Sequence, residues 1–312
     1  MRCLVTGAAG FIGSHLCEAL LAQGDEVAGL DAFIPYYPRA VKEANMASFR
    51  AHPAFTFHEL DLRCDALAAA LDGVEVIYHI AAMPGLLASW KQFDLYMTCN
   101  VQATQRLLQA TVESGRVRQF IHASTSSIYG SLVLGDEQTN PRPVSPYGIT
   151  KLAGEHLARV YQSQFGLPTS ILRYFSVYGP RQRPDMGYYL FIEAMRQGQP
   201  LTVFGTGDQL RGNTYVGDIV RATLLAHQRF EPGSVYNVGG AEEVSANQVI
   251  ALLEEIIGRR ADVRHGPTRP GEQSRALADM TLARERLGFT PQTTLRAGLE
   301  AQVAWQVALA RG

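Results

Sequence analysis

A tyrosine and a lysine stand four residues apart at Tyr147 and Lys151, in a segment whose apolar spacing predicts a helix over Tyr147–Phe165. Residues at this spacing share one face of a helix. A phenol has a pKa of about 10 and is a poor base at neutral pH. A nearby ammonium group would favour the phenolate. Only three of the 28 basic residues are lysines, so a pair at this spacing rarely arises by chance. The pair predicts proton transfer from a hydroxyl group.

A cluster of hydroxyl side chains precedes that helix. Ser124, Thr125, Ser126 and Ser127 follow an apolar run over Gln119–Ala123, which predicts a strand. Hydroxyl groups at such a strand end could orient a reacting alcohol toward the tyrosine. A serine-rich turn often does no more than satisfy backbone groups, so the cluster alone leaves both interpretations open.

A glycine-rich turn near the N-terminus lies between a predicted strand over Arg2–Thr6 and a predicted helix. Its residues are Gly7-Ala8-Ala9-Gly10-Phe11-Ile12-Gly13. This spacing lets backbone amides approach a pyrophosphate at the positive end of a helix, although such a segment is sometimes only a turn. Asp31 directly follows the next predicted strand, over Glu26–Leu30, where a carboxylate can accept two ribose hydroxyls and would repel a 2′-phosphate. The sequence therefore favours NAD over NADP.

Two further strand ends carry candidate cofactor-binding residues. Asp61 and Leu62 follow a predicted strand over Phe55–His58, where the carboxylate could cap an adenine amino group or simply be solvated. Ala81 and Ala82 follow the next predicted strand and supply small side chains beneath the phosphates, which core packing would also explain.

Alternating apolar runs and amphipathic segments in the first half predict an α/β fold, a Rossmann-type doubly wound parallel sheet. After Tyr174 the pattern of predicted elements changes. Pro180, Pro184 and Gly187 interrupt the chain, and shorter elements follow. At roughly 150 residues per domain, 312 residues suggest two domains, or one large α/β unit with an elaboration. We expect an NAD-binding domain over 1–175 and a smaller α/β substrate domain over 176–312, interleaved near the boundary.

Composition excludes several classes of function. With 28 basic and 29 acidic residues, nothing predicts a nucleic-acid partner. No apolar run reaches membrane-spanning length, so no membrane association is expected. The four cysteines are scattered without a CxxC pair, which favours reduced thiols in the cytoplasm. The eight histidines show no metal spacing, and no metal site is predicted.

The chain resembles the extended short-chain dehydrogenase/reductase family, in its nucleotide-sugar epimerase and dehydratase branch. The matching segments are TGAAGFIG from Thr6, HIAA from His79, STSSIYG from Ser124, the Tyr147/Lys151 pair, RYFSVYGPRQRPD from Arg173, FGTGDQLRGNTYVGDIV from Phe204 and RPGE from Arg269. The resemblance implies a tightly bound NAD that takes a hydride from a sugar carbon while Tyr147 takes the hydroxyl proton. The keto-sugar then turns over, and the hydride returns to its other face.

The resemblance also implies roles for individual residues. Thr125 matches the position that bridges Tyr147 and the sugar hydroxyl, and Asn100 matches a structural position. Arg211 and Arg269 match arginines that hold a substrate diphosphate, a role suited to their planar forks. The two helices predicted over Thr98–Val112 and Tyr147–Phe165 match those that form a four-helix bundle between subunits, so a homodimer is expected.

Within this branch the resemblance favours epimerisation. Dehydratases carry Asp-Glu after the catalytic threonine, and uronate decarboxylases generally carry Glu at the second position, whereas this chain has Ser126-Ser127. The segment GPRQRPDM from Gly179 resembles UDP-glucuronate 4-epimerases, in which Arg183 would pair with the sugar carboxylate. The same arginine could instead form a structural salt bridge with a neighbouring carboxylate.

Three departures from the branch affect the expected substrate site. Met83 replaces a common glutamine and Ser176 replaces the asparagine of neutral-sugar enzymes, which could alter substrate choice. Gly212-Asn213 replaces the usual Asp-Phe behind Arg211. We therefore expect an NAD-dependent UDP-glucuronate 4-epimerase, with UDP-glucose 4-epimerase or another epimerase or decarboxylase of the family as the alternative. A net dehydrogenase and a non-catalytic dinucleotide sensor are the rivals from other classes.

Overall fold

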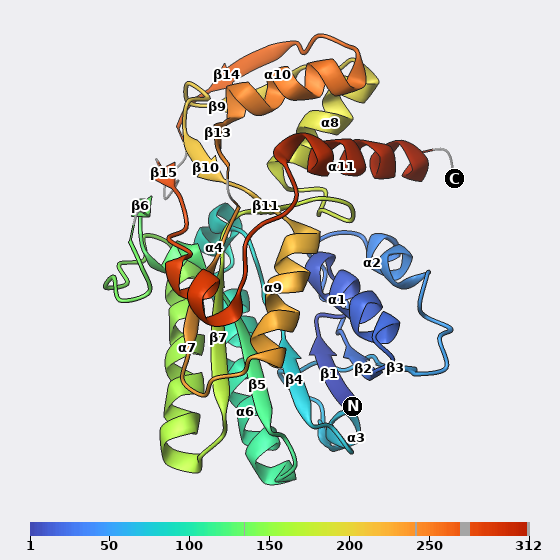
Figure 1. Cartoon of the computed structure of the whole chain (residues 1–312). Coiled ribbons are helices and arrows are strands. Elements are labelled where there is room, and N and C mark those ends of the chain that lie inside the picture. Colours follow the sequence, from blue (N-terminus) through green and yellow to red (C-terminus); the bar gives the residue numbers. More distant parts are fainter. Residues whose placement is uncertain (134, 241, 269–274, 311–312) are drawn as a thin grey trace.

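The computed structural model describes residues 1–133, 135–240, 242–268 and 275–310. Its centre is a seven-stranded parallel sheet in the order β12-β7-β5-β4-β1-β2-β3 (Figure 1). The strands are β1 (Arg2–Thr6), β2 (Glu26–Leu30), β3 (Phe55–His58), β4 (Val76–His79), β5 (Gln119–Thr125), β7 (Thr169–Tyr174) and β12 (Val235–Val238). The predicted Rossmann-type α/β fold is confirmed. The strand order reverses between β1 and β4, which is where such sheets bind ligands.

Both faces of the sheet are buried beneath helices. Side chains alternate along β1, so Cys3 and Val5 join the core under α1 (Phe11–Ala22) and α9 (Val216–Gln228). Leu4 points to the opposite core, under α6 (Ala103–Ser114), where Leu107 and Leu108 pack. Strands buried on both faces explain the nearly continuous apolar runs in the sequence.

The helix that carries Tyr147 and Lys151 is α7 (Pro146–Phe165). Its N-cap is Ser145, whose side chain accepts a hydrogen bond from the Gly148 amide, and Pro146 occupies the first turn. Gly166 ends the helix in the left-handed conformation, with φ 68°. Capping at both ends fixes the register that places the two functional side chains one turn apart.

The structure differs from prediction ahead of α6. The sequence pattern predicts one helix over Thr98–Val112, but Met97–Gln102 form a π-helical turn and the α-helix begins at Ala103. Asn100 is buried in this wider turn, and its side chain hydrogen-bonds both backbone groups of Met83. A π turn of this kind often marks a functional site.

A smaller lobe lies over the carboxyl ends of the central strands (Figure 1). It contains α8 (Gly187–Gln197), β9 (Leu201–Phe204), β10 (Leu210–Gly212), β13 (Glu243–Ser245), α10 (Ala246–Ile257), β14 (Val263–Gly266) and α11 (Leu295–Leu309). Its own core includes Ile192, Val249, Leu253 and Leu299. Between these elements the chain returns to the large lobe, where α9 lies against α1 and β12 pairs with β7.

Short elements complete the described chain. They are α2 (Arg39–Met46), α3 (Ala68–Leu71), α4 (Leu86–Lys91), α5 (Phe93–Tyr96), a 3-10 turn (Ser126–Ile128), β6 (Leu132–Val133), β8 (Val177–Tyr178), β11 (Thr214–Tyr215), β15 (Arg275–Ala276) and a π turn (Ala283–Leu287). Within the described ranges, no helix is long and apolar enough to cross a membrane, and no cluster of side chains is arranged to hold a metal ion. All four cysteines are free thiols.

Candidate active site

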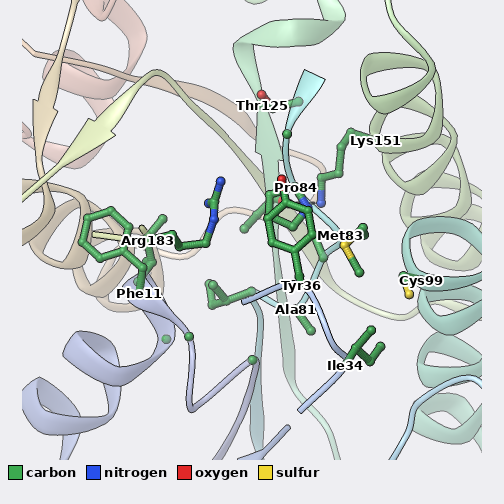
Figure 2. Close-up of a pocket in the computed structure, with 18 of the residues that line it drawn as sticks. Phe11, Ile34, Tyr36, Ala81, Met83, Pro84, Cys99, Thr125, Lys151 and Arg183 are labelled. Carbon is green, nitrogen blue, oxygen red and sulfur yellow. Dashed lines mark hydrogen bonds between the residues drawn. The ribbon is translucent and has the colours of Figure 1, made fainter. Parts of the chain in front are cut away.

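A cavity of about 390 Å³ opens at the carboxyl ends of β1 and β4, within the size range of small-molecule sites. Figure 2 shows many of the side chains that line it. The structure brings together here the following residues proposed from sequence: Gly7, Gly10, Phe11, Ile12, Gly13, Asp31, Asp61, Leu62, Ala81, Ala82, Met83, Thr125, Ser126, Tyr147, Lys151, Ser176 and Arg183. Segments far apart in the chain thus meet in one space.

The glycine-rich turn forms a tight backbone cradle at the N-terminus of α1. Gly7 has φ +72°, and a Cβ there would lie 3.0 Å from Cα of Ala81. A Cβ on Gly13 would lie 2.1 Å from the Gly7 carbonyl oxygen. Gly10 is the N-cap residue and has no side chain to cap the helix. The positive end of α1 is therefore available to a phosphate group.

At the end of β2, the Asp31 carboxylate is held in place by its surroundings. Its Oδ1 accepts a hydrogen bond of 2.8 Å from the Phe33 amide and lies 3.6 Å from Nζ of Lys42. Lys42 also lines the cavity and is not among the residues predicted from the sequence. Lysine is rare in this chain, with only three in 312 residues, and this rarity was the feature of the sequence that could have pointed to Lys42. Arg39 is paired with Glu43 and Glu59 and does not line the cavity.

Asp61 is engaged by a neighbouring arginine. Both of its carboxylate oxygens accept hydrogen bonds from the Arg63 guanidinium, which lowers the pKa of Asp61. Arg106 donates to the Leu62 carbonyl at 2.9 Å and so ties this loop to α6. The loop therefore presents an ionised, oriented carboxylate at the rim of the cavity.

Tyr147, the candidate proton acceptor, lies beside Thr125, the hydroxyl expected to bridge it to the substrate. Burial raises the pKa of the Tyr147 phenol above its ordinary value, and a hydrogen bond with Thr125 and the positive charge of Arg183 offset this only in part. Lys151 is 3% exposed, and its Nζ donates to the Ala123 carbonyl at 2.7 Å. Burial lowers the pKa of Lys151 to about 8, against the opposing influence of Glu155. The expected effect of the ammonium on the phenol stays a prediction.

Behind Lys151 lies a buried ion pair that the sequence analysis missed. Arg173 on β7 donates from Nε and Nη2 to the two carboxylate oxygens of Glu155, at 3.1 and 2.9 Å. Its Nη1 donates to the Tyr129 hydroxyl at 2.7 Å, and the Ser124 hydroxyl donates to Glu155. Glu155 follows Lys151 by one helical turn. The pair thus fixes the strand end and the catalytic helix relative to each other.

A second buried chain of hydrogen bonds starts at β1. The Thr6 hydroxyl accepts from the Ala81 amide and pairs with Nδ1 of His79 at 2.8 Å. The other ring nitrogen pairs with Thr104, whose hydroxyl donates to the Asn100 carbonyl. Burial lowers the pKa of His79 to about 3, so the ring is neutral. These contacts position the backbone of Ala81 beneath the glycine turn.

Some hydroxyl side chains of the predicted cluster line the cavity, and another contacts a lining residue. Ser126 and Ser176 line the cavity with Thr125. Ser127 is not among the lining residues; its backbone amide donates to the Thr125 hydroxyl at 3.2 Å, and its own hydroxyl lies 3.3 Å from that oxygen. Ser127 therefore orients Thr125 in this structure.

Arg183 lines the cavity and also forms a salt bridge. Its Nε and Nη2 each donate to the Asp185 carboxylate at 3.0 Å. The structural salt bridge considered from sequence therefore exists, and the guanidinium still faces the cavity beside Tyr36 and Met186.

A second cavity, of about 480 Å³, lies in the smaller lobe and is lined by Asp185, Phe204, Arg211, Asn213 and other residues. The Asn213 side chain donates to the Arg211 carbonyl, and a Cβ on Gly212 would lie 3.1 Å from Leu277. These contacts show how Gly212-Asn213 is accommodated behind the arginine. The other proposed diphosphate arginine, Arg269, lies outside the described residues.

The sheet, the glycine cradle and the buried tyrosine–lysine helix define a dinucleotide-binding enzyme. Residues 3–239 match the NAD-dependent epimerase/dehydratase family, and the chain belongs to that family. The resemblance noted from the sequence motifs is confirmed.

Three similar proteins span nearly the whole chain. A Bacillus subtilis protein named as an uncharacterized UDP-glucose epimerase, YtcB, is 44% identical over 100% of both chains. A UDP-glucuronate 4-epimerase of Thermodesulfobacterium geofontis is 33% identical over 97% of this chain and 95% of its own. The crystal structure of a UDP-glucuronic acid 4-epimerase from Bacillus cereus, in complex with UDP-glucuronic acid and NAD, is 43% identical, with a TM-score of 0.96 over 99% of this chain and 100% of that one.

Proposed function

We propose that this chain is an NAD-dependent UDP-sugar 4-epimerase that interconverts UDP-glucuronate and UDP-galacturonate. The observation that carries the proposal is that Tyr147, Thr125 and Arg183 line the same cavity as the glycine cradle. A proton acceptor, a hydroxyl that orients the sugar and a cation for its carboxylate thereby surround the space in front of a dinucleotide site. The similarity to UDP-glucuronate 4-epimerases supports the same substrate.

The cofactor is NAD, and the residues present fit it. The cradle of Gly7 and Gly13 has no room for a Cβ, so only backbone faces the pyrophosphate. Asp31 would accept the adenosine ribose hydroxyls beside Lys42, with Asp61, Leu62, Ala81 and Ala82 lining the rest of the site. When bound, NAD supplies the hydride acceptor and donor of the reaction.

Side chains of the protein transfer the proton of the C4 hydroxyl and orient the carboxylate of the sugar. Thr125 orients the C4 hydroxyl, and Tyr147 takes its proton and later returns it. Lys151, fixed on the Ala123 carbonyl, keeps a positive charge one turn from the phenol. The 4-keto form of a uronate is a β-keto acid and loses carbon dioxide when its carboxylate stands perpendicular to the ketone. Arg183 would hold the carboxylate out of that geometry, with Ser126, Ser176 and Met83 shaping the sugar pocket.

The two lobes divide the substrates between them in this proposal. Residues 1–175 would bind NAD and carry the catalytic helix, and residues 176–312 would bind the UDP group, with Arg211 and Arg269 on the diphosphate. The second cavity, which Arg211 lines, supports this division.

The proposal includes a cytoplasmic homodimer. Ile149, Val160 and Phe165 on α7 are each more than half exposed, which supports burial of this helix against a second copy. The free thiols are consistent with a reducing compartment. Light scattering of the purified chain at twice the monomer mass is the expected result.

An NMR time course of UDP-glucuronate with the purified protein tests the function. We expect UDP-galacturonate to appear without net NADH. Appearance of a UDP-pentose would identify a decarboxylase, and bulk NADH would identify a net dehydrogenase; either result would refute the proposal.

UDP-glucose 4-epimerase is the second candidate, favoured by the name of the Bacillus subtilis relative. A mixture of UDP-glucuronate and UDP-glucose separates the two. If the uronate is the substrate, Arg183→Ala should abolish the preference for UDP-glucuronate while the variant remains folded; an unchanged preference would favour the hexose enzyme.

A further inference from the structure

The cation assigned to the sugar carboxylate already has a carboxylate partner within the chain. Asp185 occupies the Nε and Nη2 edge of Arg183, with both contacts at 3.0 Å. The Tyr36 hydroxyl donates to the same Asp185 carboxylate at 3.2 Å, and the guanidinium lies 5.7 Å from the centre of the Tyr36 ring. Three residues from two distant segments therefore hold one charge pair at the wall of the cavity.

The two members of the pair face different spaces. Arg183 and Tyr36 line the cavity that contains Tyr147, whereas Asp185 lines the second cavity. The Arg183 side chain is 16% exposed and the Asp185 side chain is 39% exposed. The arginine is the confined partner, and the aspartate is the one with access to solvent.

A second carboxylate at Arg183 must compete with the first. The edge bearing Nε and Nη2 can form only one paired set of hydrogen bonds with a carboxylate. A substrate carboxylate at the other edge would lie close to the negative charge of Asp185, in a partly buried site where like charges repel. Binding of a uronate at Arg183 thus weakens the contact between Arg183 and Asp185 in either geometry.

We propose that Asp185 determines sugar specificity by competing with the substrate carboxylate for Arg183. This inference rests on the proposed function of the site. A uronate displaces Asp185 from Arg183 and takes over the guanidinium. A neutral hexose leaves the pair intact, so no unpaired cation remains in the cavity and the neutral sugar is also accommodated. Asp185 acts through Arg183 and takes no part in the chemical step.

The test compares the NAD-loaded wild-type chain with Asp185→Asn on both UDP-sugars. Asparagine keeps the size of the side chain and can still accept one hydrogen bond from Arg183, but it removes the competing charge. We expect KM for UDP-glucuronate to fall about fivefold and KM for UDP-glucose to rise by about two- to fivefold, as suits a partly exposed pair. The kcat values should stay within about twofold, since the chemical step is untouched.

Two controls separate competition from a structural effect. In an Arg183→Ala background, Asp185→Asn should leave the ratio of the two KM values unchanged, because the shared partner is gone. Asp262→Asn removes one negative charge from a pair with the same two-residue spacing, with Arg264 on the surface of the smaller lobe. It should leave both KM values as in the wild type.

Each outcome discriminates between the claims. A wild-type chain that epimerises the UDP-sugars, combined with an Asp185→Asn variant whose KM ratio is unchanged, overturns the competition and leaves the proposed function standing. An equal shift in the Arg183→Ala background also overturns it. A wild-type chain inactive on both UDP-sugars overturns the proposed function and this inference with it.

Discussion

Replacing Arg173 by methionine removes the cation of the ion pair behind Lys151. The side chains of Arg173 and Glu155 are 3% and 2% exposed, so neither charge has water as an alternative partner. The substitution leaves the Glu155 carboxylate with the Ser124 hydroxyl and the more distant charge of Lys151, and it deprives the Tyr129 hydroxyl of its donor. Methionine keeps most of the volume, so the perturbation is mainly electrostatic.

The expected loss of folding stability depends on whether one partner of the buried ion pair is removed or both are replaced. Removing one partner of such a pair costs about 3–5 kcal/mol, because a buried charge is left uncompensated. Replacing both partners with apolar side chains of similar volume is often nearly neutral. The double variant Arg173→Met/Glu155→Leu should therefore be more stable than Arg173→Met alone, by about 2 kcal/mol or more.

Urea unfolding followed by tyrosine and tryptophan fluorescence, without added cofactor or substrate, measures this difference. Ligands are left out because they would raise the apparent stability by mass action. The midpoint should fall in Arg173→Met and recover in the double variant, with little change in the slope. A loss below about 1 kcal/mol in the single variant, or a double variant less stable than the single one, would refute the reasoning.

Two further predictions concern the cofactor cradle and acid stability. Gly13→Ala places a Cβ 2.1 Å from the Gly7 carbonyl oxygen, so NAD binding measured by calorimetry should weaken at least about tenfold. The control variant Gly187→Ala, whose Cβ meets open space, should bind NAD as the wild type does. Equal NAD affinities of the two variants would contradict the assignment of the glycine turn to the cofactor. The pKa of His79 is about 3 in the folded chain against about 6.5 when unfolded. The unfolded state therefore takes up a proton that the folded state refuses, and the free energy of unfolding falls as pH drops from about 6.5 to 3, by up to about 1.4 kcal/mol per pH unit from this group. Urea midpoints across that range should decline less steeply in His79→Asn than in the wild type, and parallel profiles would show that His79 does not contribute.

Local signals in the sequence were sufficient for the sheet and the cofactor turn. The strands β1, β2 and β3 lie at their predicted residues. For β1 and β2 the reason is that strands buried on both faces give apolar runs that end at glycine or polar residues. The capped helix that carries Tyr147 follows from Ser145 and Pro146 in the same way. These features depend on neighbours in the chain.

Contacts between segments that are distant in the chain could not be predicted from the sequence. Strand β12, which completes the seven-stranded sheet, is only four residues long, and its place in the sheet is set by its pairing with β7. The pairing of Lys42 with Asp31, and of Arg173 with Glu155, depends on how helices pack against strand ends. For Arg183, the sequence is compatible with both a substrate carboxylate and a structural partner. The structure places Asp185 against the guanidinium and the guanidinium at the cavity.

The most direct test of the central claim is turnover of UDP-glucuronate by Tyr147→Phe, with bound NAD measured on the same sample. The phenol is the proposed acceptor of the hydroxyl proton, and loss of such a group costs about 10²- to 10⁴-fold in rate. We predict wild-type NAD content and formation of UDP-galacturonate reduced at least a hundredfold. A variant that holds NAD and epimerises at a rate comparable to the wild type would contradict the account.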